Sequence, residues 1–427
     1  MRTVGIIAEY NPFHTGHEYH IQTAKEKAGA DYAVVVMSPD FVQRGEPAIF
    51  DKYTRTQMAL LGGADLVLEL PICYASGSAE YFAEGAVALL DSLGVVDALC
   101  FGGESDDLHL FQLASRILLE EPEEYQQTLR LLLTKGKTYP QARAAALVSY
   151  IQQTAARNNN DAAPFASPDQ IETFLSAPNN ILGIEYCKAL QKRHSSIAPL
   201  PIRRLGSGYH SSSLSDDFCS ATALRQQITA PIYIEETDSV FRTYIPKLCY
   251  EFFRSASQTA LTSADFLPYL NEKLLSTDNF SSILDISSDL SDRIAGKRFQ
   301  CIGRSYDEII ALLKTRQITE ARIRRALLHL LLNLHTETVE QFRANGTVFY
   351  ARVLGFRRCA SPLLHALKLQ AQIPLAVKPA AAEKLLTQPA REMWQQDFYA
   401  SHLYRSVRTH KYGTVFKTEY EHSPIVF

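Results

Sequence analysis

The sequence predicts an α/β fold in which a parallel, doubly wound sheet is followed by a mostly α-helical C-terminal domain. Three observations lead to this class. Over residues 1–104, short apolar runs alternate with helical patterns, and strands spaced by helices form parallel sheets. The polar loops of this region follow the ends of the strands, where such sheets bind ligands. Beyond about residue 236 the apolar residues recur mostly at helical spacing.

The first strands and helices are marked by their composition and by the residues that end them. Tyr32–Met37 is an uninterrupted apolar run, as expected of a strand that is buried on both faces. Glycines end the first two helices, and Pro71 stops the third strand. The predicted strands are Gly5–Ala8, Tyr32–Met37, Leu66–Leu70 and Ala98–Phe101, and the predicted helices are His14–Lys27, Lys52–Leu61 and Ala79–Leu93.

A helical insertion is predicted at about residues 105–176, with a polar loop at 157–164. A strand at Ile197–Ile202 and a helix at Ala223–Ile228 return the chain to the α/β pattern. Residues 1–235 are therefore predicted to form the first domain. The helices predicted in the insertion are Leu108–Leu119, Pro122–Leu132 and Thr138–Gln153.

Residues 236–427 are predicted to form a mostly helical, basic second domain. Between Arg293 and Arg358 there are thirteen Lys or Arg residues against five Asp or Glu residues. This asymmetry indicates either a polyanionic partner or a solvated basic helix face, and charge alone favours neither. The predicted elements are helices Asp265–Leu274, Ser287–Gly296, Ser305–Lys314, Thr319–Leu334 and Ser361–Leu369, and a short strand at Thr347–Leu354.

The composition is that of an ordinary globular protein, with 46% hydrophobic residues and a formal net charge of −3. No apolar run approaches eighteen residues, so no membrane span is expected, and Glu9 and Pro12 interrupt any signal-peptide pattern. The seven cysteines are scattered and never in Cys-x-x-Cys spacing. They indicate reduced thiols in a cytoplasmic protein, with neither a zinc site nor disulfides.

The N-terminal strand runs into a turn at Asn11-Pro12 and a helix that is predicted to carry His14 and His17 in its first turn. Residues three apart share one helix face, and Gly16 between them allows close approach to the backbone. The free amides of a helix N-terminus, together with two imidazoles, form a surface suited to phosphate groups. His14 and His17 are therefore the candidate catalytic residues.

The loop after the second strand contains a second candidate set: Asp40, Gln43 and Arg44, with Lys52 on the next helix. Arg44 and Lys52 would clamp phosphates or another substrate group. The alternative is an exposed loop with solvated salt bridges.

Three further loops carry candidates for nucleotide contacts. Gly102 follows the fourth strand, and Arg203 and Arg204 follow the fifth. Asn179 and Asn180 lie in a turn ahead of a helix, where capping the helix and contacting a nucleotide compete evenly.

Ser220, Thr222 and Arg225 lie at the start of the helix that is predicted at Ala223–Ile228. Hydroxyls, amides and a guanidinium that converge there would grip the β- and γ-phosphates of a triphosphate. A simple serine N-cap is the alternative.

In the C-terminal half, Thr319 is predicted to cap a helix with Arg322 and Arg325 on one face. Near the end, aromatic and basic residues interleave from Tyr404-Arg405 to Lys417. Interleaved aromatic and basic residues are typical of RNA-binding surfaces, although they also occur on ordinary protein surfaces.

Taken together, the motifs of this chain resemble those of the bacterial tRNA(Met) cytidine acetate ligases, which contain the His-x-Gly-His motif of the nucleotidylyltransferase superfamily. The resemblance is specific over residues 1 to about 230 and looser from there to Thr319–Arg325. The matching segments are Glu9–His17, Gln43–Ala48, Glu69–Pro71, Phe101–Glu104, Pro178–Gly183, Gly208–His210 and Ser220–Thr222.

The resemblance implies a Rossmann-like HxGH nucleotidylyltransferase domain and an ATP-dependent ligase. Such an enzyme converts acetate to acetyl-adenylate and transfers the acetyl group to N4 of the wobble cytidine of elongator tRNA(Met). Mg²⁺ is expected with ATP, the cytoplasm is the expected location, and Arg322 and Arg325 become candidates for tRNA contacts.

Carried over by position, the family's ATP contacts fall on one continuous loop and on three later contacts. Two of these later contacts are each a choice between two neighbouring residues. The loop residues are Ile7, Ala8, Glu9, Tyr10, Asn11, Pro12, Phe13, His14, Thr15, Gly16, His17, Glu18, Tyr19 and His20, and the later contacts are Gly102, Asn179 or Asn180, and Arg203 or Arg204.

Two other functions are compatible with parts of the pattern. A nucleotidylyltransferase that adenylylates a small molecule would keep the histidine chemistry and have no use for tRNA. An inactive relative would bind RNA only, which the intact His14, Gly16, His17 and Arg225 argue against.

Overall fold

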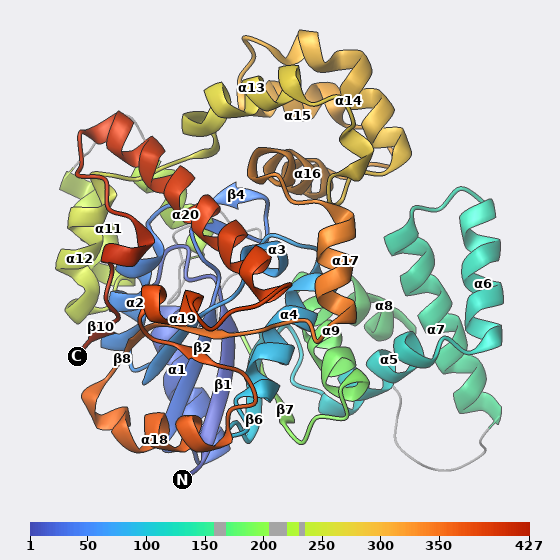
Figure 1. Cartoon of the computed structure of the whole chain (residues 1–427). Helices are drawn as coiled ribbons and strands as arrows, with labels where there is room; N and C mark the ends of the chain where they lie inside the picture. Colours follow the sequence, from blue (N-terminus) through green and yellow to red (C-terminus); the bar gives the residue numbers. More distant parts are fainter. Residues whose placement is uncertain (158–167, 205–219, 230–234) are drawn as a thin grey trace. The chain divides into compact units, whose positions relative to one another are not determined.

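Figure 1 shows the computed structural model of the chain, which describes residues 1–157, 168–204, 220–229 and 235–427. Contacts divide the chain into two units. The larger unit contains Met1–Ala98 and Leu205–Phe427, and the smaller contains Leu99–Arg204. The larger unit thus includes residues from both sides of the predicted division at 235/236, and the predicted insertion at 105–176 lies within the smaller one. The predicted two-domain division itself stays a prediction.

The sheet of the larger unit has the strand order β10-β8-β5-β2-β1, with β9 beside β8. β1, β2 and β5 are parallel, with Val4 opposite Ala33 and Val35 opposite Val67. The strands are β1 (Thr3–Ala8), β2 (Tyr32–Met37), β5 (Leu66–Glu69), β8 (Ala351–Phe356), β9 (Leu375–Ala376) and β10 (Ile425–Val426).

The parallel direction predicted for the N-terminal strands is confirmed, but the sheet as a whole is mixed, because β8 runs antiparallel to β5. The three N-terminal strands follow one another through helical crossovers, which impose a parallel direction. β8 reaches the sheet from the helical C-terminal half and is free of that constraint. The predicted strand Thr347–Leu354 overlaps β8 at residues 351–354, and it belongs to the N-terminal sheet.

The helices of the N-terminal part occur where the sequence predicts them. They are α1 (Thr15–Ala28), α2 (Lys52–Leu61) and α4 (Ala79–Ser92), together with the short α3 (Ile72–Ala75), which was not predicted. Gly29 ends α1 in the left-handed conformation, with φ +57°. Asp51 caps α2 by accepting from the amides of Tyr53 and Thr54.

The loop after β2 folds into a two-stranded antiparallel hairpin, β3 (Phe41–Val42) and β4 (Glu46–Pro47). Gly45 in its turn has φ +77° and lies against the backbone of Arg324 and Arg325; a Cβ there would lie 2.3 Å from the Arg325 nitrogen. Only glycine fits this conformation and this contact. The hairpin is therefore fixed on α16 (Glu320–Leu332), the helix that begins at the predicted cap Thr319.

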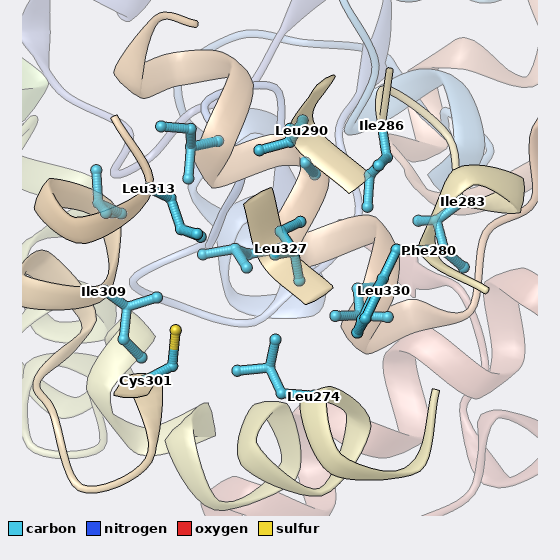
Figure 2. Close-up of a cluster of buried hydrophobic side chains, with 14 of the residues drawn as sticks. Leu274, Phe280, Ile283, Ile286, Leu290, Cys301, Ile309, Leu313, Leu327 and Leu330 are labelled. Atoms are coloured by element: carbon cyan, nitrogen blue, oxygen red, sulfur yellow. The ribbon is translucent and has the colours of Figure 1, made fainter. Parts of the chain in front are cut away.

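The helices between residues 267 and 332 pack around an apolar cluster of their own. Leu327 and Leu330 of α16 lie in this cluster with side chains of the preceding helices, such as Leu290 and Leu313, as Figure 2 shows. The remaining helices of the larger unit are α10 (Ala221–Thr229), α11 (Glu235–Tyr244), α12 (Tyr250–Ser257), α13 (Leu267–Ser276), α14 (Ser288–Cys301), α15 (Tyr306–Leu313), α17 (Thr336–Ala344), α18 (Ser361–Gln370), α19 (Pro379–Glu383) and α20 (Ala390–Tyr412).

The smaller unit contains two strands and a group of helices. Its predicted elements occur within a few residues of their expected bounds, and most of the predicted loop at 157–164 lies outside the described residues. The elements are β6 (Ala98–Gly103), α5 (Leu108–Glu120), α6 (Glu123–Thr134), α7 (Tyr139–Arg157), α8 (Pro168–Ser176), α9 (Pro178–Lys192) and β7 (Ala198–Arg203). In the described part of the chain, no helix has the length and apolarity needed to cross a membrane.

Candidate nucleotide-binding site

The two histidines lie at the turn between β1 and α1, where each is bound to the backbone of the turn. α1 begins at Thr15, so His14 is the N-cap residue and does not belong to the first turn as predicted. The Gly16 amide donates to Nδ1 of His14 over 3.0 Å, and the His14 amide donates to Nδ1 of His17 over 3.3 Å. The centroids of the two rings lie 3.9 Å apart.

These hydrogen bonds fix the tautomer of both rings. Since Nδ1 accepts an amide hydrogen in His14 and in His17, the proton of each neutral ring must be on Nε2. An imidazolium would have to give up its amide bond, because it has no acceptor nitrogen. In this geometry each neutral ring presents Nε2–H as its donor, which suits both histidines to contacts with phosphate oxygens.

Two buried aromatic side chains pack against the ring of His17 in this turn. Tyr10 and Phe13 are buried, and their ring centroids lie 4.8 Å and 5.7 Å from that of His17. Gly62 makes room for Phe13, because a Cβ at Gly62 would lie 2.2 Å from Cζ of Phe13. Tyr10 has φ +49°, a strained conformation for a residue with a side chain.

The remaining residues of the predicted ATP loop range from buried to exposed. Asn11 and Pro12 are buried and Tyr19 is exposed, while the half-buried residues are Ile7, Ala8, Glu9, Thr15, Gly16, His17, Glu18 and His20. The Asn11 side chain accepts from the Ile49 amide over 2.7 Å and so joins this loop to the segment before α2.

Arg225 lies against the same turn, although it is more than two hundred residues away in sequence. Its Nη1 donates to the Asn11 carbonyl over 2.7 Å, and its Nη2 donates to Oγ1 of Thr222 over 3.3 Å. The Ser220 hydroxyl accepts from the Ala223 amide at the start of α10. The structure thus brings the predicted phosphate clamp to the histidine turn, and the serine acts there as a helix cap.

The tip of the β3–β4 hairpin reaches the same place. Nη1 of Arg44 donates to Oγ1 of Thr222 over 3.3 Å, and the Gln43 amide donates to Oε1 of Glu9 over 3.0 Å. Burial raises the pKa of Glu9, while the charges of Arg44 and Arg225 act to lower it. Gln43 and Arg44 of the predicted substrate loop therefore adjoin the candidate phosphate clamp.

Lys52 and Asp40, the other two predicted loop residues, are buried elsewhere. Nζ of Lys52 is fully buried and contacts Glu69 at 2.5 Å and Glu419 at 2.9 Å. Asp40 accepts from the Lys52 amide over 2.8 Å. Both residues fix the start of α2, and neither is exposed at the histidine turn.

The Lys52 contacts belong to a buried ionic network that joins the C-terminal segment to the sheet. Its members are Lys52, Arg352 and Arg405, which are cations, and Glu69 and Glu419, which are anions. Burial would raise the pKa of Glu419, but Arg352, Lys52 and Arg405 hold it well below its usual value.

This network corrects one expectation for the C-terminal residues. Tyr404 and Arg405 are both buried in the protein interior, although the pattern of aromatic and basic residues suggested an RNA-binding surface. The sequence alone does not show whether a basic side chain will pair with a buried carboxylate of the same protein or with a phosphate of RNA.

Arg55 has a role that the sequence did not reveal. Its fully buried guanidinium donates to the carbonyls of Glu9 and Ser38 over 2.7 Å and 2.9 Å, and also to those of Pro39 and Phe50. One side chain thus joins the loops that follow β1 and β2. The signal was weak, because an arginine on a helix is ordinarily a surface residue.

In the smaller unit, the predicted residues gather at the ends of β6 and β7. A Cβ at Gly102 would lie 3.1 Å from Cγ of Arg204, and the Arg204 amide donates to the Gly103 carbonyl over 2.9 Å. Arg203 is the last residue of β7 and is exposed.

The two asparagines do not cap α9, which begins at Pro178 after Ala177. Oδ1 of the buried Asn180 accepts from the amides of Glu104 and Ser105, and Nδ2 of Asn179 donates to Oε1 of Glu104 over 2.7 Å. The side-chain oxygen of Asn180 is thus used to stabilise the loop after β6. Asn179 lies more openly beside it and is the stronger of the two candidates for a nucleotide contact.

Arg322 and Arg325 both bind Asp285: Nε of Arg325 lies 2.7 Å from its carboxylate, and Nε of Arg322 lies 3.2 Å from its carbonyl. These contacts use part of each guanidinium and anchor α16 to the preceding segment. The two residues share one helix face, as predicted, and both are half-buried.

The residues described do not provide a metal site made of protein ligands. Among them, no three His, Cys, Asp or Glu side chains are grouped so that they could hold a metal ion.

Comparison with known proteins points to one family. Residues 1–418 match the family model described as HIGH Nucleotidyl Transferase. Curated relatives named tRNA(Met) cytidine acetate ligase include one from Thermoanaerobacter sp., 40% identical over 95% of each chain. Another, from Clostridium kluyveri, is 38% identical over 100% of this chain and 99% of the relative.

Solved structures agree with the sequence relatives. The chain is similar over the full length of both chains to Thermotoga maritima TmcAL, with 31% identity. The TM-score is 0.90 for the apo form and 0.87 for the form bound with alpha-thio ATP.

Proposed function

Because the chain belongs to the HIGH nucleotidyl transferase family, in which it groups with the tRNA(Met) cytidine acetate ligases, we propose that it is an ATP-dependent ligase for acetate and tRNA(Met). The proposed product carries an acetyl group on N4 of the wobble cytidine of elongator tRNA. Such an enzyme would work in the cytoplasm, with Mg²⁺ bound to the phosphates of ATP.

The observation that carries this proposal is the pair of Nε2–H donors at the β1–α1 turn, with Arg225 bound to the same turn. A carboxylate oxygen of acetate forms a bond to the α-phosphorus, and the bond to the β-phosphate breaks. His14 and His17 would donate to the equatorial oxygens as negative charge shifts between them. Arg225 would hold the pyrophosphate, which leaves with the electron pair of the broken bond.

In the second step, the exocyclic amine of the cytosine attacks the acetyl carbonyl, AMP leaves and the amine loses a proton. The mixed anhydride hydrolyses if water reaches it, so the cytosine must arrive in a closed site. Arg322 and Arg325 are the proposed tRNA contacts, made through the guanidinium nitrogens that Asp285 does not occupy.

The direct test is to incubate the protein with ATP, radiolabelled acetate and tRNA. The expected result is label in tRNA(Met), with one AMP and one pyrophosphate formed for each acetyl group. Label that remains absent from tRNA while the protein is folded and binds ATP would disprove the ligase function.

A second experiment separates the two steps. Exchange of pyrophosphate into ATP should depend on acetate and proceed without tRNA. Replacing Arg322 and Arg325 with glutamine removes their charge without setting a carboxylate against Asp285; it should reduce tRNA labelling and leave the exchange rate unchanged, and the same replacement at the exposed Arg316 is the control. If the exchange occurs and the replacement has no effect on labelling, the tRNA lies elsewhere on the protein.

A further inference from the structure

Four charged side chains, two of each sign, lie beside the histidine turn. The guanidiniums of Arg44 and Arg225 both donate to the single hydroxyl of Thr222, each over 3.3 Å. Two cations that converge on one neutral oxygen repel each other unless negative charge is nearby. Glu9 and Glu46 supply that charge, which leaves the group formally neutral.

Glu46 is bound much less firmly than the other members of the group. Its Oε1 lies 3.5 Å from Nη2 of Arg225, and this buried oxygen has no hydrogen-bond partner in the described structure. Glu9, in contrast, accepts a hydrogen bond from the Gln43 amide. An unsatisfied carboxylate oxygen is unfavourable in a buried position, so this contact is one that a better ligand can replace.

Arg225 is held in a way that permits such an exchange. Nη1 is bound to the Asn11 carbonyl over 2.7 Å, which anchors the guanidinium at the turn. Nη2 faces Thr222 and Glu46 through longer contacts of 3.3 Å and 3.5 Å. A phosphate oxygen accepts charge-assisted hydrogen bonds from a guanidinium and would bind better than the distant carboxylate.

We propose that Glu46 is a stand-in for the polyphosphate: it neutralises Arg225 in the empty site, is displaced when phosphates bind, and then repels them. Glu46 is a positioning residue that acts through Arg225, and it sets the affinity for the β- and γ-phosphates and for released pyrophosphate. This inference rests on the proposed function of Arg225 as a phosphate ligand. Repulsion by Glu46 would then limit how tightly the site holds the pyrophosphate that it has released.

The test is a measurement of binding to the full chain by calorimetry, with ATP and with inorganic pyrophosphate, in the absence of acetate and tRNA. Glu46→Gln keeps the shape of the side chain and removes its charge. It should bind both ligands about 1.5-fold to fivefold more tightly, which is the range expected for a partly exposed charge pair. In steady-state assays, inhibition by pyrophosphate should tighten by the same factor.

Three further variants keep this test decisive. Glu46→Ala should also bind ATP and pyrophosphate more tightly. It replaces Glu46→Gln in the test if the Glu46→Gln protein does not fold. Glu46→Asp keeps the charge and should bind like the unaltered protein. Glu80→Gln removes an equal charge from a contact with Arg343 on other helices and should change neither affinity.

Unchanged or weaker binding of pyrophosphate by Glu46→Gln would overturn the inference, because Glu46 would then merely orient Arg225. That outcome is distinct from failure of the proposed function. A protein that binds pyrophosphate more tightly after the substitution but never labels tRNA supports the role of Glu46 and contradicts the ligase reaction.

Discussion

The backbone amide of His14 donates to Nδ1 of His17, so the residue that caps α1 also sets the tautomer of the second histidine. The same residue therefore serves the stability of the helix and the chemistry of the site. These two roles can be separated by choosing substitutions that keep one of them.

His14→Asn should keep the helix cap and lose the Nε2–H donor. Asparagine is among the best N-cap residues, whereas His14→Ala loses both roles and should cost about 1 kcal/mol of stability in addition. Both variants should reduce the turnover number by about 100- to 1000-fold, as expected for the loss of one transition-state donor. Acetate-dependent pyrophosphate exchange measures turnover, and urea unfolding measures stability. Equal turnover of His14→Asn and the unaltered protein would contradict the catalytic role.

Lys52→Met should destabilise the protein by roughly 3–5 kcal/mol, because it leaves the buried Glu69 and Glu419 with one cation fewer. The urea midpoint is the measurement. Lys314→Met is the control, since Lys314 pairs with Glu320 at 3.5 Å on the surface and should change the stability by less than about 0.5 kcal/mol. Similar effects of the two substitutions would show that Lys52 is not in a buried network.

Asp397 should make stability depend on pH in an unusual direction. Burial, reinforced by Glu69, raises its pKa from 3.8 to about 7, against hydrogen bonds from Tyr350 and the Ile72 amide. Its folded form therefore keeps a proton that the unfolded chain has released. This contribution to stability is complete below pH 3.8 and is lost as the pH rises to about 7.

The measurement is the free energy of unfolding of the unaltered protein and of Asp397→Asn between pH 4 and pH 7. The difference between them should shift in favour of the asparagine variant as the pH rises. A difference that stays constant over this range would show that Asp397 is ionised in the folded protein.

Gly45→Ala should displace the hairpin from α16, because its Cβ would lie 2.3 Å from the backbone nitrogen of Arg325. Since Arg44 lies in the turn of this hairpin and would be displaced with it, ATP affinity should fall together with stability. Gly303→Ala is the matched control: Gly303 has a similar φ of +81°, but no atom of the described residues lies within 4 Å of its Cβ position. It should cost only about 1–2 kcal/mol of backbone strain and leave ATP affinity unchanged. Equal loss of affinity in both variants would contradict the role of the hairpin.

Local patterns in the sequence predicted most of the elements. β2 and α2 have the predicted bounds. A short run of aliphatic residues marks β2 in the sequence, and an aspartate cap marks the start of α2. The histidine turn and Arg225 could be found because their chemistry is specific.

The remaining features depend on contacts between distant residues. Lys52 resembled a phosphate ligand because Glu419, its partner, lies at the other end of the chain. The antiparallel direction of β8 follows from where the chain enters the sheet, which no local pattern records. Asn180 resembled a helix cap because its true partners, the amides of Glu104 and Ser105, belong to a loop that is distant in sequence.

The hydroxyl of Tyr53 donates to Glu419 across 366 positions of sequence, and β8 covers the edge of β5. During synthesis, the N-terminal strands therefore leave the ribosome long before the segments that close their sheet and neutralise Lys52. Such long-range pairing is slow, and it exposes an open strand edge while the chain is incomplete. Nascent chains that end before β8 should accordingly depend on chaperones to protect the open edge of β5.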